Sequence, residues 1–156
     1  MNEPEVEYAG FWIRVAASLI DTVLMLLIIT PVLISIYGWE YFDGVEAGFV
    51  AGTADFLLSY IAPALAVIVF WIYKSATPGK MVVSARIVDA TTGLPPSVGQ
   101  SIGRYFAYYL STLPLLLGFV WVAFDKRKQG WHDKLAGTVV VRTKAPLGVP
   151  VRFPPG

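Results

Sequence analysis

Three long stretches without a charged residue constrain this chain more than any other feature of its sequence. They cover residues 22–39, 56–73 and 105–124. Each approaches the roughly 20 apolar residues that a helix needs to cross the hydrocarbon core of a bilayer. Of the 156 residues, 56% are hydrophobic and only 15% are charged, a composition too apolar for a soluble domain of this length. The sequence therefore predicts an integral membrane protein with the lipid bilayer as its first partner.

Composition and motif content argue against several other classes of protein. The formal net charge is only +1 and no basic stripe interleaves with aromatic residues, so no nucleic-acid partner is expected. The chain has no cysteine, which removes disulfides, thiolate metal sites and a cysteine nucleophile. We find no recurrent metal-ligand spacing, no phosphate-binding glycine loop and no recognisable catalytic triad. We therefore expect no metal, no cofactor and no enzymatic activity.

The first two apolar stretches predict a transmembrane hairpin. Helix one should run from the interfacial aromatic residues near Phe11 to about Tyr37, and helix two should cover residues 56–73. The connection between them, residues 38–55, carries four acidic residues and no Lys or Arg, whereas residues 74–104 carry four basic residues. Because cytoplasmic loops are enriched in Lys and Arg, we expect the N-terminus and residues 74–104 to be cytoplasmic.

Two β-branched segments lie outside the apolar stretches. Residues 81–89 (MVVSARIVD) follow a turn at Thr77-Pro78-Gly79, and residues 138–141 follow Gly137. Single strands are unstable, so we expect these two to pair with each other on the cytoplasmic side. Residues 145–156 are rich in Pro and Gly without periodicity and predict a disordered tail, which leaves residues 1–144 as a single membrane domain.

The last apolar segment, residues 98–124, is compatible with two topologies. A single crossing would place seven basic residues of the C-terminal region outside the cell, against the usual charge bias. From Val98, apolar residues recur at helical spacing while Arg104 and Ser111 fall on the opposite side, as in an interfacial amphipathic helix. Pro114 interrupts that helix, and residues 115–124 would span only about 15 Å. We predict an interfacial or re-entrant segment with a cytoplasmic C-terminus; the alternative is a third, tilted span.

The first candidate site consists of polar residues in helix one. Arg14 and Asp21 lie two turns apart on one face, with Ser18 between them. A carboxylate at the depth of Asp21 costs about 2.5 to 3.5 kcal/mol on insertion scales, so it requires a partner, a proton or water. The axial separation of ~10 Å makes a direct pair with Arg14 strained, so the predicted partner is a basic residue from another element, such as Arg104. Arg14 itself is expected to extend toward the headgroups.

A second polar cluster follows the last apolar stretch, in residues 124–138 (FDKRKQGWHDKLAGT). In one interpretation, His132 and Asp133 form a proton relay or a ligand pair. In the other, the segment is a solvated loop that binds lipid headgroups, and for His132 alone this interpretation is favoured.

Taken together, these residues resemble the RDD family of small bacterial membrane proteins, named for one arginine and two aspartates. The resemblance rests on AGFWIRVAASLIDTVLM, ATPGKMVVSARIVDATTG, GQSIGRY and DKRKQGWHDKLAGTVVV, which cover nearly the whole chain in order. Arg14 and Asp21 stand at the arginine and the first aspartate, and Asp133 fills the second. The supporting residues are Ser18, Lys80, Arg104 and His132. The resemblance implies a multi-pass protein of the bacterial cytoplasmic (inner) membrane, and transport of an unidentified ligand, with sodium/proton exchange in some members.

Two functions remain open at this point. In the first, Arg14, Asp21 and Asp133 support movement of a cation, a proton or a small solute. Two or three hydrophobic segments cannot readily enclose a path, so transport would require self-association or a membrane protein partner. In the second, the chain is a non-transporting accessory or adaptor subunit, in which the same residues hold the elements in register. The expected fold is the same: an all-α membrane protein, with a two-helix hairpin, a C-terminal interfacial or re-entrant segment and a small strand pair.

Overall fold

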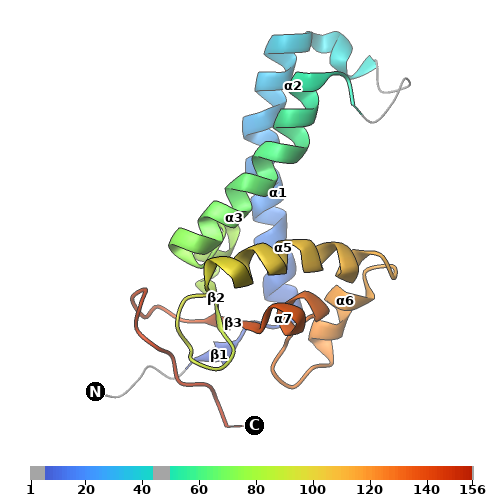
Figure 1. Cartoon of the computed structure of the whole chain (residues 1–156). Coiled ribbons are helices and arrows are strands. Elements are labelled where there is room, and N and C mark those ends of the chain that lie inside the picture. Colours follow the sequence, from blue (N-terminus) through green and yellow to red (C-terminus); the bar gives the residue numbers. More distant parts are fainter. Residues whose placement is uncertain (1–5, 44–49, 156) are drawn as a thin grey trace.

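Two long apolar helices and a small sheet at one end of them dominate the architecture (Figure 1). The computed structural model describes residues 6–43 and 50–155. The first long helix is α1 (Phe11–Tyr37), and the second is the helical stretch Thr53–Lys74. Both are long and apolar enough to cross a bilayer, which confirms the two predicted helices.

The second long helix changes its winding along its length. It consists of α2 (Thr53–Phe56), a π-helical turn (Leu57–Ile61) and α3 (Ala62–Lys74). Only 6% of the most apolar window of either long helix is buried within the protein, so their apolar side chains face outward. An apolar surface of this extent is suited to contact with lipid. A short 3-10 helix, Trp39–Tyr41, follows α1 at the far end of the hairpin.

The sheet has three strands rather than the predicted two. β2 (Ala85–Asp89) and β3 (Thr138–Arg142) pair antiparallel, as expected, with Ile87 opposite Val140. β1 (Glu7–Tyr8) pairs with the other edge of β3, so the order is β1-β3-β2. The predicted strand over residues 81–89 is too long, because Pro78–Val82 forms the short helix α4. Proline at the first helical position favours that helix start.

Alternating residues of β3 contribute to two apolar clusters, one on each face of the sheet. Val139 and Val141 pack with Val88 on one face, and Val140 packs with Ile87 and Trp71 on the other. Because Trp71 belongs to α3, the second cluster attaches the sheet to the hairpin.

The C-terminal segment, for which the sequence predicts disorder, contacts the sheet through its described residues, 145–155. Val151 is 3% exposed and belongs to the cluster that contains Val139 and Val141. The guanidinium of Arg86 donates to the carbonyls of Ala145 at 2.8 Å and Pro146 at 3.0 Å. A segment without periodicity is held here because it covers an apolar sheet face and because Arg86 satisfies its carbonyls.

The last apolar segment forms a bent pair of helices. α5 (Val98–Thr112) starts with a capping box between Ser97 and Gln100 and ends before Pro114, as predicted. The axis then turns by 111° into a stretch that contains α6 (Leu117–Val120), followed by a 3-10 turn, Trp121–Ala123. Among the described residues, a third crossing is possible by length and composition only if this bent pair forms one span.

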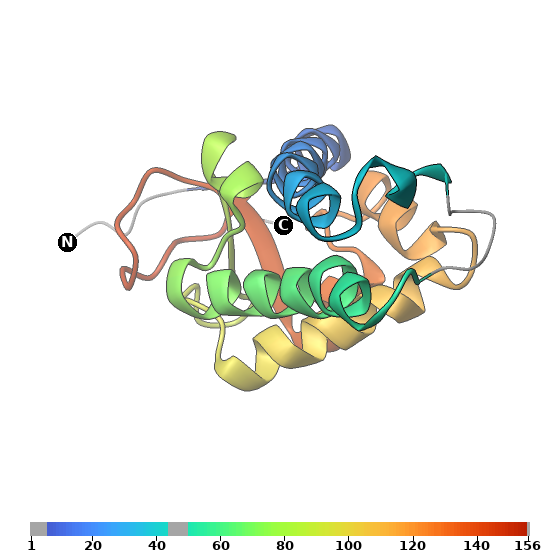
Figure 2. The ribbon, with the colours of Figure 1, turned by 90° about the horizontal axis from the view of Figure 1, so that it is seen from above.

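α5 is amphipathic as expected. Its polar side, however, faces the rest of the protein and not the solvent. Arg104, Ala107 and Ser111 are buried on the side toward α7 (Trp131–Ala136), whereas Phe106 and Leu110 are exposed. α5 runs across the end of the hairpin, and α7 lies beside it (Figures 1 and 2). We call β1, β2, β3, α5 and α7 the headpiece. Since β2 precedes α5 and β3 follows α7, the paired strands bring both ends of the bent segment back to one end of the molecule.

Candidate functional site

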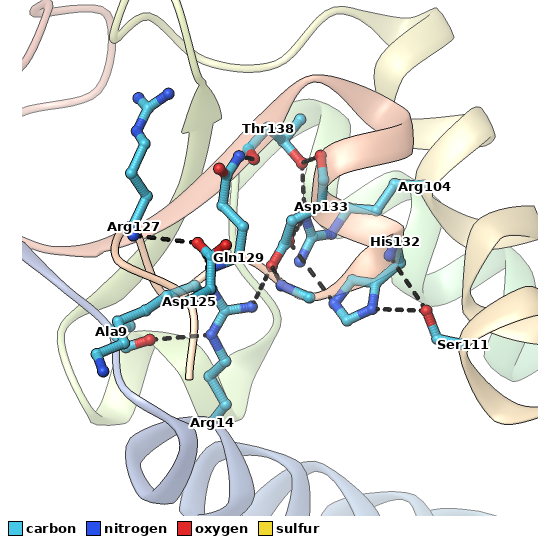
Figure 3. A network of polar contacts seen from close by, with 12 residues as sticks. Ala9, Arg14, Arg104, Ser111, Asp125, Arg127, Gln129, His132, Asp133 and Thr138 are labelled. Carbon is cyan, nitrogen blue, oxygen red and sulfur yellow. Dashed lines mark hydrogen bonds and ion pairs between the residues drawn. The ribbon is translucent and has the colours of Figure 1, made fainter. Parts of the chain in front are cut away.

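Asp133 is the centre of a buried ionic network that joins α1, α5 and α7 (Figure 3). Its side chain is 0% exposed and accepts hydrogen bonds on both oxygens. Arg14 Nη1 donates to Oδ2 at 2.6 Å, the Gly130 N–H donates to the same oxygen at 2.8 Å, and Arg104 Nη1 donates to Oδ1. Burial alone would raise the pKa of the Asp133 carboxyl, but the two guanidinium groups hold it below its usual range. Asp133 is therefore a charged, fully paired carboxylate.

Arg14 points into this network. The prediction that its side chain extends toward the lipid headgroups is therefore wrong. Besides Asp133, it donates through Nε to the carbonyl of Ala9 at 3.0 Å and through Nη2 to the carbonyl of Lys128 at 2.5 Å. Arg14 lies in the first turn of α1, where the chain has just left β1, so its side chain reaches the headpiece directly. One guanidinium thus ties together residues that lie more than a hundred positions apart in the sequence.

Arg104 pairs with Asp133, and the prediction that it pairs with Asp21 is wrong. It is 0% exposed, and Nη1 also donates to Thr138 Oγ1 at 2.6 Å, which connects α5 to the start of β3. Its guanidinium carbon lies 5.4 Å from the ring centroid of Trp71 and 5.6 Å from that of Tyr108. Both contacts have the separation of a cation–π interaction.

Asp21 binds the start of α4 instead of a cation. Its Oδ2 accepts from the Thr77 hydroxyl at 2.5 Å, and its Oδ1 accepts from the Gly79 N–H at 2.7 Å. Thr77 is the N-cap residue of α4, whose first N–H groups have no partner within the helix. Asp21 therefore supplies from α1 the acceptor that a capping side chain usually provides. Among the residues that the structure describes, Asp21 forms no ion pair with Arg14 or Arg104.

The supporting residue Ser18 does not join either group. Its side chain is exposed, and its carbonyl accepts from the Thr22 hydroxyl at 2.8 Å, a bond within α1. The predicted polar face of helix one is thus divided, because Arg14 belongs to the ionic network and Asp21 to the cap of α4.

His132 is a buried residue of the headpiece, so the interpretation as a solvated headgroup-binding group is wrong for it. Its Nδ1 lies 3.2 Å from Ser111 Oγ, and its ring stacks on Tyr108 with centroids 4.3 Å apart. Burial lowers the pKa of His132 to about 3, so the imidazole is neutral near pH 7. Its Nε2 lies 3.6 Å from Asp133 Oδ1, too far for a good hydrogen bond.

Lys80 is buried beside the network without contacting Asp133. It is 8% exposed, and its Nζ lies 5.9 Å from the ring centroid of Trp71. Burial lowers its pKa, and no hydrogen bond or ion pair of its ammonium is found within residues 6–43 and 50–155.

A second buried carboxylate, Asp55, lies at the opposite end of the hairpin, at the end of the segment that the sequence predicts as the outer connection. It is 3% exposed and accepts from the Tyr41 hydroxyl at 2.9 Å, the Ala51 N–H at 2.8 Å and the Ser59 hydroxyl at 2.7 Å. These bonds close the turn between the two long helices. A carboxylate directly before an apolar helical stretch is the signal that could have identified it.

Comparison with known proteins identifies relatives, most of them without a described activity. A model of the RDD family matches residues 8–137. The uncharacterised protein YxaI of Bacillus subtilis is 31% identical over an alignment of 156 residues that covers 85% of this chain and 96% of the relative. The uncharacterised protein RP437 of Rickettsia prowazekii is 42% identical over 76 residues, 49% of this chain and 42% of the relative.

A more distant match is a proline-rich antigen homolog of Mycobacterium tuberculosis, 33% identical over 63 residues, 40% of this chain and 26% of the relative. The match thus spans less than half of RP437 and about a quarter of the antigen, but nearly all of YxaI. None of these names denotes an enzyme, and no solved structure matches.

Proposed function

Because the chain belongs to the RDD family, we propose that it is a multi-pass accessory or adaptor subunit of the bacterial cytoplasmic membrane that does not itself transport ions. The observation that carries this proposal is the engagement of both candidate carboxylates. Asp21 accepts from Thr77 and Gly79, and Asp133 accepts from two arginines and a backbone N–H. A site that binds and releases a cation needs oxygens that are not already held by strong protein donors.

The same contacts support a role in holding the headpiece on the hairpin. The network of Arg14, Arg104 and Asp133 joins α1, α5 and α7, and Asp21 joins α1 to α4. Buried ion pairs of this kind specify which elements pack together. The result is a rigid surface at one end of a lipid-embedded hairpin, which is what an adaptor would present to another membrane protein or to a second copy of the chain.

A shallow apolar groove beside α5 supports association with a partner. It has a volume of about 680 Å³ and is lined by Gly103, Phe106, Ala107, Tyr109, Leu110 and Leu135. Gly103 has open space around its α-carbon, whereas Gly118, another small residue of this region, packs against Ser111. A glycine on an exposed helix face allows a second helix to approach closely within lipid.

The sheet supports a topology in which the bent segment does not cross the membrane. β2 and β3 flank the bent segment and are hydrogen-bonded to each other, and β1 joins the same sheet. The N-terminal strand, residues 85–97 and the C-terminal region then all lie on one side, which the charge bias assigns to the cytoplasm.

Single cysteines test this topology in a chain that has none of its own. We expect an impermeant thiol reagent to label Asp43→Cys on intact cells, and to label Thr91→Cys and Lys126→Cys only after permeabilisation. All three positions are exposed. Labelling of Lys126→Cys but not Thr91→Cys on intact cells would instead establish the third span.

Flux measurements in proteoliposomes test the proposed function. We expect wild-type vesicles to remain as tight as empty ones under both a sodium gradient and a pH gradient. Asp21→Asn should leave flux at that baseline and lower stability by about 1 to 3 kcal/mol, because the Thr77 hydroxyl loses its acceptor. Asp43→Asn, which changes an exposed carboxylate, is the matched control and should unfold like wild type. Wild-type flux that disappears in a folded Asp21→Asn protein would mean that the chain is a transporter.

A further inference from the structure

Four side chains that carry hydrogen-bond donors meet where α3, α4 and α5 come together. Trp71 is at the centre: Lys80 Nζ lies 5.9 Å and Arg104 Cζ lies 5.4 Å from its ring centroid, and the Tyr108 ring is centred 5.5 Å away. Trp71 is 1% exposed, Lys80 8% and Arg104 0%. We call Trp71, Lys80 and Arg104 the donor cluster.

The donor cluster has no acceptor of its own. An indole N–H, an ammonium and a guanidinium can only donate hydrogen bonds. Trp71 Nε1 and Arg104 Nε are buried and have no hydrogen-bond partner among the described residues. Lys80 Nζ likewise has only its contact with the Trp71 ring in the part of the chain that is described. Buried donors are nearly always satisfied in proteins, so the two unpartnered N–H groups of Trp71 and Arg104 indicate a missing acceptor, and the Lys80 ammonium lies against the same indole ring.

The charges around the donor cluster indicate that this acceptor is an anion. Among the residues that the structure describes, three cationic side chains, Arg14, Lys80 and Arg104, face two carboxylates, Asp21 and Asp133. The oxygens of both carboxylates are already engaged, by Thr77 and Gly79 and by the network around Asp133. Within residues 6–43 and 50–155, one cationic side chain of the three therefore has no carboxylate of its own, and a bound anion would provide the counter-charge.

A water molecule satisfies the donor cluster less well than an anion does. Water that accepts from these donors must also donate its own two hydrogens, and the side chains of Trp71, Lys80 and Arg104 have no acceptor to receive them. Trp71 stands three residues before the end of α3, and Lys80 lies just beyond it in α4. For a helix that crosses the bilayer, this is the depth of the lipid headgroups.

We infer that Trp71, Lys80 and Arg104 bind one phosphate group, supplied either by the headgroup of an anionic phospholipid or by free phosphate. An oxyanion with several acceptor oxygens matches a site made only of donors, and basic pockets between membrane helices bind such headgroups. This inference does not depend on the adaptor function, because a transporter with the same fold would contain the same site.

Thermal unfolding of the purified full chain in detergent tests the inference. Phosphatidylglycerol is compared with phosphatidylcholine, and sodium phosphate with sodium chloride at equal ionic strength. We expect one of the two phosphate sources to raise the unfolding temperature of the wild-type protein in a saturable manner. Lys80→Gln should weaken the apparent affinity about tenfold, as expected for loss of one charge-assisted contact. Trp71→Phe, which keeps a ring but removes the N–H, should weaken it to a smaller extent.

Lys74→Gln is the matched control, because Lys74 is the exposed last residue of α3, close to the donor cluster in sequence but outside it. The Lys74→Gln variant should bind the stabilising phosphate source with the same apparent affinity as the wild-type protein. A response to phosphatidylglycerol alone would identify a lipid headgroup, and a response to inorganic phosphate would identify a soluble anion. The inference is wrong if neither phosphate source raises the unfolding temperature of the wild-type protein. It is also wrong if Lys74→Gln weakens binding as much as Lys80→Gln does.

Discussion

Asp133→Asn should lower the free energy of unfolding by about 3 to 5 kcal/mol, the largest effect that we expect from one substitution in this chain. The carboxylate is 0% exposed and is the counter-charge for both Arg14 and Arg104. An asparagine of the same shape keeps one acceptor but leaves two guanidinium groups without a negative charge. The folded-state pKa of Asp133 is depressed, so this stabilisation is present above the ordinary carboxyl pKa and is lost only as the pH falls below it.

Chemical unfolding in detergent, followed by tryptophan fluorescence, measures this loss. Lys134→Gln is the control, since its ammonium pairs with Asp125 in the same segment but its side chain is 45% exposed. We expect that control to change stability by less than about 1 kcal/mol. If Asp133→Asn and the wild-type protein have the same free energy of unfolding, the network does not stabilise the headpiece.

Gly79→Ala should separate α4 from α1 and lower the free energy of unfolding by about 3 kcal/mol. A β-carbon at this position would lie 2.0 Å from the carbonyl oxygen of Ala17 and 2.8 Å from Asp21 Cγ. The carbonyl belongs to the backbone of a long helix and cannot move aside. The helices must therefore shift, and the bond from the Gly79 N–H to Asp21 is lost with them.

Gly103→Ala is the matched control for this prediction. It makes the same substitution in a helix, but nothing lies within 4 Å of the added β-carbon. Alanine is the better helix former, so we expect a neutral result or a gain of about 0.5 to 1 kcal/mol in unfolding experiments. If the two alanine variants are equally stable, the close contact between α1 and α4 is not present in the protein.

The hairpin could be predicted from the sequence because its signal is local. A long uncharged, mainly apolar stretch and an acidic connection are properties of the segments themselves, and α1 and α3 end close to the predicted positions. The pairing of β2 with β3 was also predictable, because two β-branched segments on one side have no other strand of comparable length to pair with. The break of the last apolar segment at Pro114 follows from the missing N–H of proline.

Other elements could not be predicted, since their structure depends on what covers them. β1 is only two residues long and is a strand because β3 offers it a free edge. Met81 and Val82 belong to the segment that predicts a strand, but they are helical in the structure. The reason is that Asp21 caps α4, the helix that contains them. The C-terminal segment is held by the sheet face that Val151 covers and not by any pattern of its own.

The sequence alone determined that Asp21 requires a partner, because placing a carboxylate in an apolar environment is costly. Only the tertiary structure decided which partner it has, and only the tertiary structure brought Arg14 and Asp133 together. Arg14 binds Asp133 across 119 positions, and Asp21 binds a hydroxyl and a backbone N–H from α4 rather than Arg104. A hydrogen bond is effective only within about 3 Å, and that proximity is set by how the helices pack.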